Sequence, residues 1–415
     1  MRRLICLLLT LMILLPTGAL ASDNADLDEA LANIFPKYKT AGAVVVVAKD
    51  GEIIYHYDYG YAYIKDREPV TPETYFRVAS VTKIVSAIRV MQLVEEGLLE
   101  LDKPIGDYLG FKVQNLKYRN VPVTLRQLMS HTSSISQRGG YSRDRRLDEF
   151  LDASLNHQSN WENWAPGSQY TYSNFGAGLM GSLMEIVTQK DINTCVTEGV
   201  FAPLNIDAAY HISLLGDPNK AAYTYKQDGK TLNKSRSAYL REAWEPEIDP
   251  NKHYTITVGA LWIRGDDLCR LGIALCEGGE VDGVRLLQPE TVAQMMSSQE
   301  GLGDVTVDSP YGLCVNRVSN LLADRMIYGH QGLSEGILSN LYFDPETHLV
   351  FAMISNGCST SMNDHIGKLS RRVFAEVWDR YGNQRHEKKR WRKAIAFSFA
   401  LPDRFVGRAL LHEHP

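Results

Sequence analysis

Apolar side chains recur at helical spacing directly after the segment Phe76-Arg-Val-Ala-Ser-Val-Thr-Lys83. The apolar positions and the glycine that follows them are Ile84, Ile88, Met91, Val94 and Gly97. This period predicts an α-helix that ends at the glycine, because glycine readily takes the left-handed conformation. Ser80 is expected in the first turn, where free backbone N–H groups point outward, and Lys83, three residues later, shares its face of the helix.

Strand and helix patterns are concentrated near both ends of the chain. At the start they predict a helix at 24–36 and two strands, 41–48 and 53–59, around an Asp-Gly turn. After Gly259 they predict helices at 266–277, 289–297 and 364–381 and strands at 311–318, 325–329, 337–343 and 349–355. We therefore expect 22–100 and 257–382 to build one domain of the α/β (α+β) class, an antiparallel sheet flanked by helices.

Residues 101–256 have a different character. Strand patterns are scarce there, and short amphipathic stretches such as Thr124 to Met129 and Leu147 to Leu155 predict a mainly helical inserted domain. One of its turns, Ser130-His-Thr-Ser133, is rich in hydroxyl groups. We interpret its histidine, His131, as a hydrogen-bond partner of the backbone rather than as a catalytic group.

The two ends of the chain differ in composition from the rest. Residues 1–21 combine an arginine pair, a short apolar run and a small-residue cleavage site, which predicts a secretory signal peptide and an exported protein. An uncleaved anchor is the alternative, although the apolar run is short for a membrane span. The tail 383–415 is basic, with six lysines or arginines within 385–393. A solvated tail is favoured over membrane-surface contact by residues 385–401, because Pro402 ends a short apolar stretch.

Composition excludes several other classes of protein. The formal net charge is −5 and 44% of the residues are hydrophobic, so we expect no nucleic-acid partner. Without the signal peptide five cysteines remain, an odd number, and no C-x-x-C or H-E-x-x-H pattern occurs. We therefore expect no metal site, no cofactor and no disulfide scaffold.

The spacing of Ser80 and Lys83 suits nucleophilic catalysis. A free serine is a poor nucleophile and needs a neighbouring group that takes its proton. An amine one helical turn away is such a group, and Tyr172, if brought near a lysine, would have its pKa lowered toward the range of a general base. Taken alone, the Ser–Lys pair also fits an ordinary helix start without chemistry.

Two other motifs compete with this interpretation. The segment Gly176-Ala-Gly-Leu-Met-Gly181 has dinucleotide-binding spacing, but no apolar strand precedes it, and close helix packing explains its small residues better. The segment Gly332-Leu-Ser-Glu-Gly336 matches the G-x-S-x-G pattern of an α/β-hydrolase esterase, with His348 and His365 downstream. The residues that follow predict a strand rather than the required helix, so Ser334 is kept only as the alternative nucleophile.

Three segments occur together in a specific order: Ser80 to Lys83, Tyr172-Ser-Asn174 and His330-Gln-Gly332. With them, the chain resembles the serine β-lactamase and penicillin-binding-protein superfamily over roughly residues 25 to 380. The resemblance is strongest to the class C branch, which includes D-alanyl-D-alanine carboxypeptidases and related esterases. It implies a β-lactamase/transpeptidase-like fold.

The resemblance also implies catalytic roles. Ser80 would attack an acyl carbonyl and form an acyl-enzyme. Lys83 and Tyr172 would share the proton transfers, and Asn174 would orient both Lys83 and the substrate. The oxyanion would lie between the backbone N–H groups of Ser80 and Leu333.

The substrate side of the motif departs from the β-lactamases. His330, two residues before Gly332, stands where those enzymes have lysine and would face the substrate. A free histidine titrates near pH ~6.5, so it is a weaker carboxylate anchor than lysine and disfavours efficient β-lactam hydrolysis.

These implications together predict an exported serine hydrolase that acts on a small-molecule or peptide substrate. A D-amino-acid peptidase or carboxypeptidase and a small-ester esterase both fit, with cell-wall peptides and β-lactams among the candidate substrates. The alternative from another class is a non-catalytic penicillin-binding or sensor protein that keeps the fold.

Overall fold

The computed structural model describes residues 24–139, 145–155, 158–242, 244, 247–299, 311–323 and 325–382. The predicted signal peptide, 1–21, and the predicted basic tail, 383–415, lie outside these residues. Within them, no helix has both the length and the apolar character that crossing a membrane requires.

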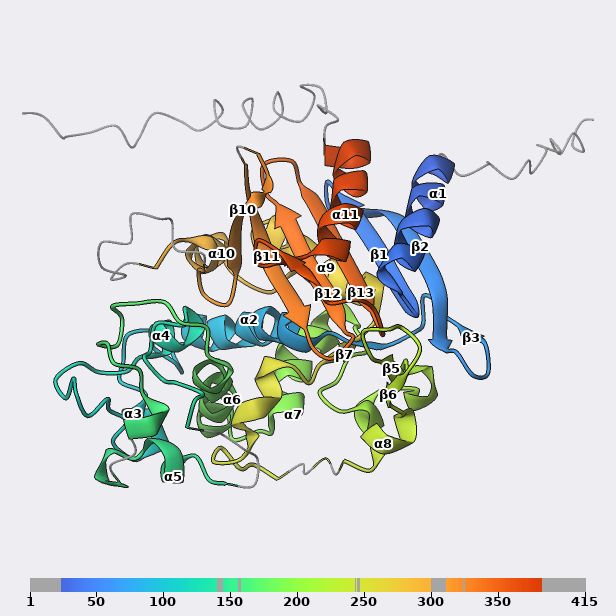
Figure 1. Ribbon diagram of the computed structural model, residues 1–415. Helices are drawn as coiled ribbons and strands as arrows, with labels where there is room; N and C mark the ends of the chain where they lie inside the picture. The colour runs from blue at the N-terminus through green and yellow to red at the C-terminus, as the bar shows by residue number, and fades with distance from the viewer. Residues whose placement is uncertain are drawn as a thin grey trace, which may run out of the picture.

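A seven-stranded antiparallel sheet forms the centre of the molecule (Figure 1). Its strand order is β10-β11-β12-β13-β1-β2-β3. In that order the strands span Asn316–Leu322, Arg325–Leu333, Leu338–Asp344, Leu349–Ser355, Gly42–Lys49, Glu52–Tyr63 and Glu68–Pro69. Strand β1 pairs with β13 from Ala43↔Ser355 to Lys49↔Leu349, so segments from both ends of the chain share one sheet, as predicted.

Helices cover both faces of this sheet. Helices α1 (Ala25–Ile34) and α11 (Lys368–Val377) pack together on one face, and α9 (Gly265–Cys276) lies on the other with α2 (Thr82–Glu95). Along β1, Val45 belongs to the apolar cluster of the first face and Val44 to that of the second, because successive side chains of a strand point to opposite faces. An antiparallel sheet flanked by helices is therefore confirmed.

Helices, most of them short, dominate the described part of residues 101–256. They are α3 (Gly106–Leu109), α4 (Leu125–Met129), α5 (Asp148–Leu151), α6 (Asn174–Thr188), α7 (Ile192–Val196) and α8 (Arg236–Leu240), with a hairpin of β5 (Thr224–Tyr225) and β6 (Leu232–Lys234). Helix α6 packs on α2, α4 and the 3-10 turn η9 (His253–Val258). A Cβ at Gly178 would lie 1.7 Å from the carbonyl oxygen of Tyr254, so the small residues of the rejected dinucleotide motif serve close packing. The domain limits remain a prediction.

The remaining elements are short: β4 (Phe76–Arg77), β7 (Trp262–Ile263), β8 (Glu280–Val281), β9 (Val284–Arg285), α10 (Pro289–Met296), β14 (Met362–Asn363) and β15 (Ile366–Gly367). Several predicted boundaries were wrong: β2 and β11 each end four residues later than predicted, and β10 and α11 begin later. Strand β10 begins five residues later than predicted, because the chain before it turns at Cys314, which has a left-handed φ of 56°. Helix α11 begins later because Asp364 and His365, with φ of 46° and 63°, form the β14–β15 hairpin.

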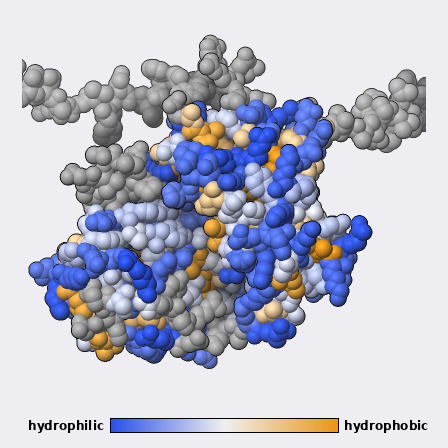
Figure 2. All heavy atoms as spheres, viewed as in Figure 1, coloured by the Kyte–Doolittle hydropathy of each residue, from blue (hydrophilic) through white to orange (hydrophobic). Residues whose placement is uncertain are grey.

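Hydrophilic residues cover most of the face shown in Figure 2, and hydrophobic ones appear in small separate groups. The large apolar side chains are mainly buried in the two clusters beside the sheet. Leu333, at the end of β11, is an exception with 41% of its surface exposed. Its exposure matters because it adjoins the turn that carries Ser80.

Candidate active site

Ser80 lies in a strained turn between the sheet and helix α2. The turn is a 3-10 turn, Ala79–Val81, so Ser80 stands just before the helix and not in its first turn as predicted. Ala79 has a left-handed φ of 44°, which costs a non-glycine residue about 1–2 kcal/mol and interrupts the helical geometry. The Thr82 hydroxyl donates to the Ala79 carbonyl at 2.6 Å and holds the turn in place.

Lys83 is fully buried beneath the Ser80 hydroxyl. Its Nζ donates to Ser80 Oγ at 3.1 Å and to the Val258 carbonyl at 2.9 Å. Burial lowers the pKa of Lys83 to about 7, because a buried ammonium loses its hydration. Much of this amine is therefore neutral near pH 7 and able to accept a proton.

Tyr172 comes from the helical part of the chain and reaches the same amine. The Nζ of Lys83 lies 5.1 Å from the centre of the Tyr172 ring. The structure thus brings Tyr172 to Lys83, although 89 positions separate them in the sequence (172 − 83). Lys83 is the residue that joins the serine and the tyrosine.

The backbone of Asn174 lies at the start of helix α6, and the predicted role of its side chain stays a prediction. Asn174 is the first residue of α6, and its backbone N–H donates to Gln137 Oε1 at 3.1 Å. Among the described residues, the hydrogen bonds of the Lys83 amine go to Ser80 and to the Val258 carbonyl, not to Asn174. The Val258 carbonyl is therefore a partner of the Lys83 amine that the sequence pattern did not reveal.

The last residues of β11 have a free edge in the described part of the sheet. Pairing of β10 with β11 reaches only Gly329. Across the β11–β12 hairpin, Ser334 and Ile337 exchange both backbone hydrogen bonds. The next pair, Leu333↔Leu338, is therefore a non-hydrogen-bonded pair, which directs the Leu333 N–H away from β12 and toward the free edge.

Gly332 brings this edge against the Ser80 turn. A Cβ at Gly332 would lie 2.2 Å from the carbonyl oxygen of Val78 and 3.1 Å from the backbone nitrogen of Ser80. The Ser339 hydroxyl, on the neighbouring strand, donates to the same Val78 carbonyl at 2.6 Å. The backbone N–H groups of Ser80 and Leu333 therefore lie where the turn meets the strand, at a contact too close for any side chain.

His330 is on the Lys83 side of β11 but is 2% exposed. Its Nε2 accepts a hydrogen bond from the Tyr311 hydroxyl, and its Nδ1 donates to the Gln331 carbonyl at 2.7 Å. Burial and the Lys83 charge lower the pKa of His330 to about 3, so the ring is neutral. The prediction that His330 faces the substrate does not match this geometry, because Tyr311 occupies the nitrogen that would have made that contact.

The rival nucleophile has the wrong surroundings. Ser334 is exposed in the hairpin turn between strands β11 and β12, so a strand follows it and not a helix. Downstream, the ring of His348 is paired with Glu277 at 2.8 Å. The α/β-hydrolase alternative is therefore wrong, for the reason that the sequence pattern indicated.

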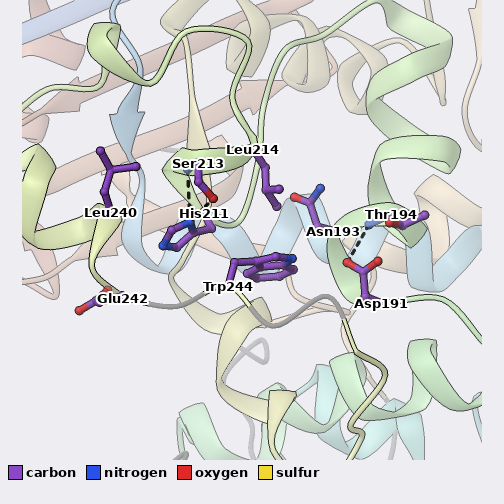
Figure 3. Close-up of a pocket in the computed structure, with 9 residues that line it drawn as sticks. All are labelled: Asp191, Asn193, Thr194, His211, Ser213, Leu214, Leu240, Glu242 and Trp244. Atoms are coloured by element: carbon purple, nitrogen blue, oxygen red, sulfur yellow. Dashed lines mark hydrogen bonds between the residues drawn. The ribbon is translucent and has the colours of Figure 1, made fainter.

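A pocket of about 360 Å³ in the helical part contains none of the predicted site residues (Figure 3). It is lined by Asp191, Asn193, Thr194, His211, Ser213, Leu214, Leu240, Glu242 and Trp244. Its histidine is already engaged through both ring nitrogens, with the Ser213 hydroxyl at 2.7 Å and the Tyr239 carbonyl at 3.1 Å.

The described residues contain no group of three or more histidine, cysteine, aspartate or glutamate side chains that could hold a metal ion. Cys195, Cys269, Cys276, Cys314 and Cys358 are all buried free thiols there.

A buried amine that holds a serine hydroxyl is the arrangement of a serine hydrolase, since it supplies the proton acceptor that serine lacks. The chain belongs to the family described as Beta-lactamase, whose model matches residues 24–373. The resemblance inferred from the three motifs is thereby confirmed. The chain therefore has the β-lactamase fold.

The chain is 24% identical over 213 residues to protein flp of Staphylococcus aureus strain N315, covering 49% of this chain and 42% of that protein. It is 32% identical over 224 residues to esterase EstB of Burkholderia gladioli, covering 51% of this chain and 56% of the esterase. The chain thus spans about half the length of these relatives.

Solved structures share the fold over more of the chain. The octameric penicillin-binding protein homologue from Pyrococcus abyssi has a TM-score of 0.65 at 22% identity, covering 87% of this chain and 78% of that one. A family VIII carboxylesterase has a TM-score of 0.65 at 20% identity, covering 86% and 98%. The D-amino acid amidase from Ochrobactrum anthropi SV3 has a TM-score of 0.64 at 21% identity, covering 86% and 99%.

Proposed function

We propose that the protein is an exported hydrolase that cleaves small neutral esters through an acyl-enzyme on Ser80. The observation that carries the proposal is the 3.1 Å hydrogen bond between Ser80 Oγ and a Lys83 amine that is fully buried. Burial lowers the pKa of this amine to about 7, so its neutral form is available near pH 7 to take the serine proton, as nucleophilic catalysis requires. Export rests on the signal-peptide pattern of residues 1–21.

In the acylation step, Ser80 Oγ forms a bond to the acyl carbon while its proton passes to Lys83. The negative charge on the carbonyl oxygen is held by the N–H groups of Ser80 and Leu333. The bond to the alcohol oxygen then breaks, and the alcohol leaves with a proton delivered through Lys83 and Tyr172. Water attacks the acyl-enzyme by the reverse proton route and releases the acid.

The surroundings of the nucleophile favour a neutral acyl group. His330 is covered and uncharged, and strand β11 carries no lysine or arginine after Arg325. Leu333 exposes an apolar side chain next to the proposed oxyanion site. A substrate with a free carboxylate, such as a D-alanyl-D-alanine peptide or a β-lactam, meets no cation on this strand. The partial identity to esterase EstB supports the same choice.

The test is mass spectrometry of the protein produced from the full chain and treated with a fluorophosphonate. We expect one adduct, on the peptide that contains Ser80, and an intact mass that lacks the first 21 residues. Wild-type protein should hydrolyse p-nitrophenyl acetate faster than it releases D-alanine from a D-alanyl-D-alanine peptide. Preferred release of D-alanine would establish a carboxypeptidase instead, and an adduct without any turnover would favour a penicillin-binding or sensor protein.

Gly332→Ala is expected to lower kcat for p-nitrophenyl acetate by about 10²–10³-fold, because the new Cβ separates the Leu333 N–H from the Ser80 turn. The matched control is Gly283→Ala, at a left-handed φ of 77° with no atom within 4 Å of the added Cβ. The control should lose some stability to backbone strain but keep its kcat. An unchanged kcat in Gly332→Ala would remove this strand edge from the mechanism.

A further inference from the structure

His131 holds both backbone neighbours of Tyr172. The N–H of Thr171 donates to the His131 carbonyl at 3.0 Å, and the N–H of Ser173 donates to His131 Nδ1 at 3.2 Å. Ser173 is also the N-cap of α6, because its hydroxyl accepts the N–H of Gly176 at 3.0 Å. The interpretation that this histidine bonds to the backbone is confirmed, and the segment it holds is the one that carries the tyrosine.

The ring of His131 also supports the phenol directly. Its centre lies 4.2 Å from the centre of the Tyr172 ring and 4.6 Å from that of Tyr311. His131 is only 2% exposed, so its ring packs against the Tyr172 ring without water between them. Tyr172 is therefore fixed from its backbone and from one face of its ring, while Lys83 lies near the ring as well.

The protonation state of His131 suits this role. Because Nδ1 accepts the Ser173 N–H, the ring proton is on Nε2, and Nε2 has no hydrogen-bond partner among the described residues. Burial, and next the nearby Lys83 amine, hold the pKa of His131 well below its ordinary value. The imidazole therefore stays neutral and keeps its acceptor at Nδ1.

His131 occupies a backbone conformation that ordinary side chains avoid. Its φ is 58°, in the left-handed region, at the turn that follows α4. This region is unfavourable for most side chains, and asparagine is among the few that visit it routinely. This left-handed conformation allows the His131 carbonyl to contact Thr171 while the His131 ring contacts Ser173.

We propose that His131 is a positioning residue that holds Tyr172 in reach of Lys83 and Ser80 through its carbonyl, its Nδ1 acceptor and its ring. The inference rests on the proposed function, because Tyr172 matters only if it moves protons there. Misplacement of a catalytic group by about 1 Å can cost on the order of 10²-fold in rate. Loss of the Nδ1 acceptor should therefore slow acylation more than it weakens substrate binding.

Three substitutions separate the acceptor from the ring. His131→Phe keeps a ring against Tyr172 but leaves the Ser173 N–H without an acceptor. His131→Asn keeps an oxygen near the position of Nδ1 and tolerates the left-handed turn. His131→Gln places its acceptor nearer the position of Nε2. The matched control is His348→Phe. His348 also has a left-handed φ, 55°, and its ring is paired with Glu277, which is not one of the proposed site residues.

The acylation rate, KM and rate of fluorophosphonate labelling at Ser80 are measured for each variant, with thermal unfolding alongside. We expect His131→Phe and His131→Gln to acylate about 10–100-fold more slowly with KM changed by less than about 3-fold, and His131→Asn to stay within about 5-fold of wild type. His348→Phe should keep wild-type kinetics. If His131→Phe does not fold, the comparison of Asn with Gln still decides the matter.

Two results would overturn the inference: wild-type acylation in His131→Phe with only a lower Tm, or an Asn variant as slow as the Phe and Gln variants. The first would leave His131 a merely structural residue, and the second would show that the Nδ1 acceptor is not used. Neither result affects the proposed function if wild-type protein labels at Ser80. Failure of wild-type labelling would instead remove the proposed function itself.

Discussion

Ser80→Ala is expected to abolish hydrolysis of p-nitrophenyl acetate, with kcat lower by on the order of 10⁴-fold or more. The substitution removes the oxygen that bonds to the acyl carbon but leaves the backbone N–H groups of Ser80 and Leu333 in place. Any residual rate would therefore measure what substrate binding and the proposed oxyanion site supply alone. Steady-state kinetics on purified protein, with fluorophosphonate labelling followed by intact mass, checks the prediction.

The control for this loss is Ser334→Ala, which removes the serine of the rival G-x-S-x-G motif. Its side chain is exposed in a hairpin turn, so kcat and the labelling stoichiometry should remain near those of wild type. Activity that survives in Ser80→Ala and disappears in Ser334→Ala would overturn the assignment. Tm values equal to that of the wild type in both variants would show that a loss of activity in either one does not come from unfolding.

The predictable features of this protein are those set by neighbours in the sequence. The Ser80–Lys83 contact follows from one helical turn, and it survives even though the left-handed Ala79 moves Ser80 out of the helix. Strand β13, Leu349–Ser355, has the predicted limits because it is buried along its whole length and lies between two partner strands. Both features leave a local signal in the sequence, the first as a three-residue spacing and the second as a continuous apolar run.

Tyr172 was placed by resemblance and not by its own surroundings. Its contact with Lys83 joins the helical part of the chain to α2, and no local pattern determines such a contact. The order of the three motifs supplied the prediction, and the structure supplies the ring position. The roles of both residues in proton transfer remain predictions until variants are assayed.

For His330 and Asn174, resemblance to the family motifs was not enough to predict the contacts in the site. His330 is hydrogen-bonded to the Tyr311 hydroxyl, and the Lys83 amine is hydrogen-bonded to the Val258 carbonyl. A side chain that closes a site from another segment leaves no periodic signal in the sequence. Such contacts become visible only in the three-dimensional packing, where His330 is buried and neutral.

Lys83→Met is expected to lower kcat/KM for p-nitrophenyl acetate by about 10³-fold, because methionine fills similar space but accepts no proton. Lys83→Arg should be equally inactive, since a guanidinium keeps its charge at any pH used. Pre-steady-state kinetics should place the loss in acylation. Either variant within tenfold of wild type would exclude the amine as the proton acceptor.

The role of Lys83 also predicts how kcat/KM changes with pH. The pKa of Lys83 is lowered to about 7, so kcat/KM of the wild type should rise as pH passes through about 7 and the amine becomes neutral. Lys83→Met lacks the titrating group and should lose this limb of the profile. A wild-type profile that stays flat between about pH 6 and about pH 9 would contradict the neutral amine.

The lowered pKa of Lys83 should also make the stability of the protein depend on pH, and stability should rise with pH as activity does. The pKa of Lys83 is about 7 in the folded protein and 10.5 in the unfolded chain. Between these two pH values the unfolded chain binds more protons at Lys83 than the folded protein does. The contribution of Lys83 to the free energy of unfolding therefore rises with pH across this window and is smallest below it. Lys83→Met carries no such dependence. The Tm of the variant minus that of the wild type should therefore be most positive below about pH 7 and shrink toward about pH 10. A difference that stays constant or grows over this window would mean that the amine is charged when buried, and the nucleophile would then lack its base.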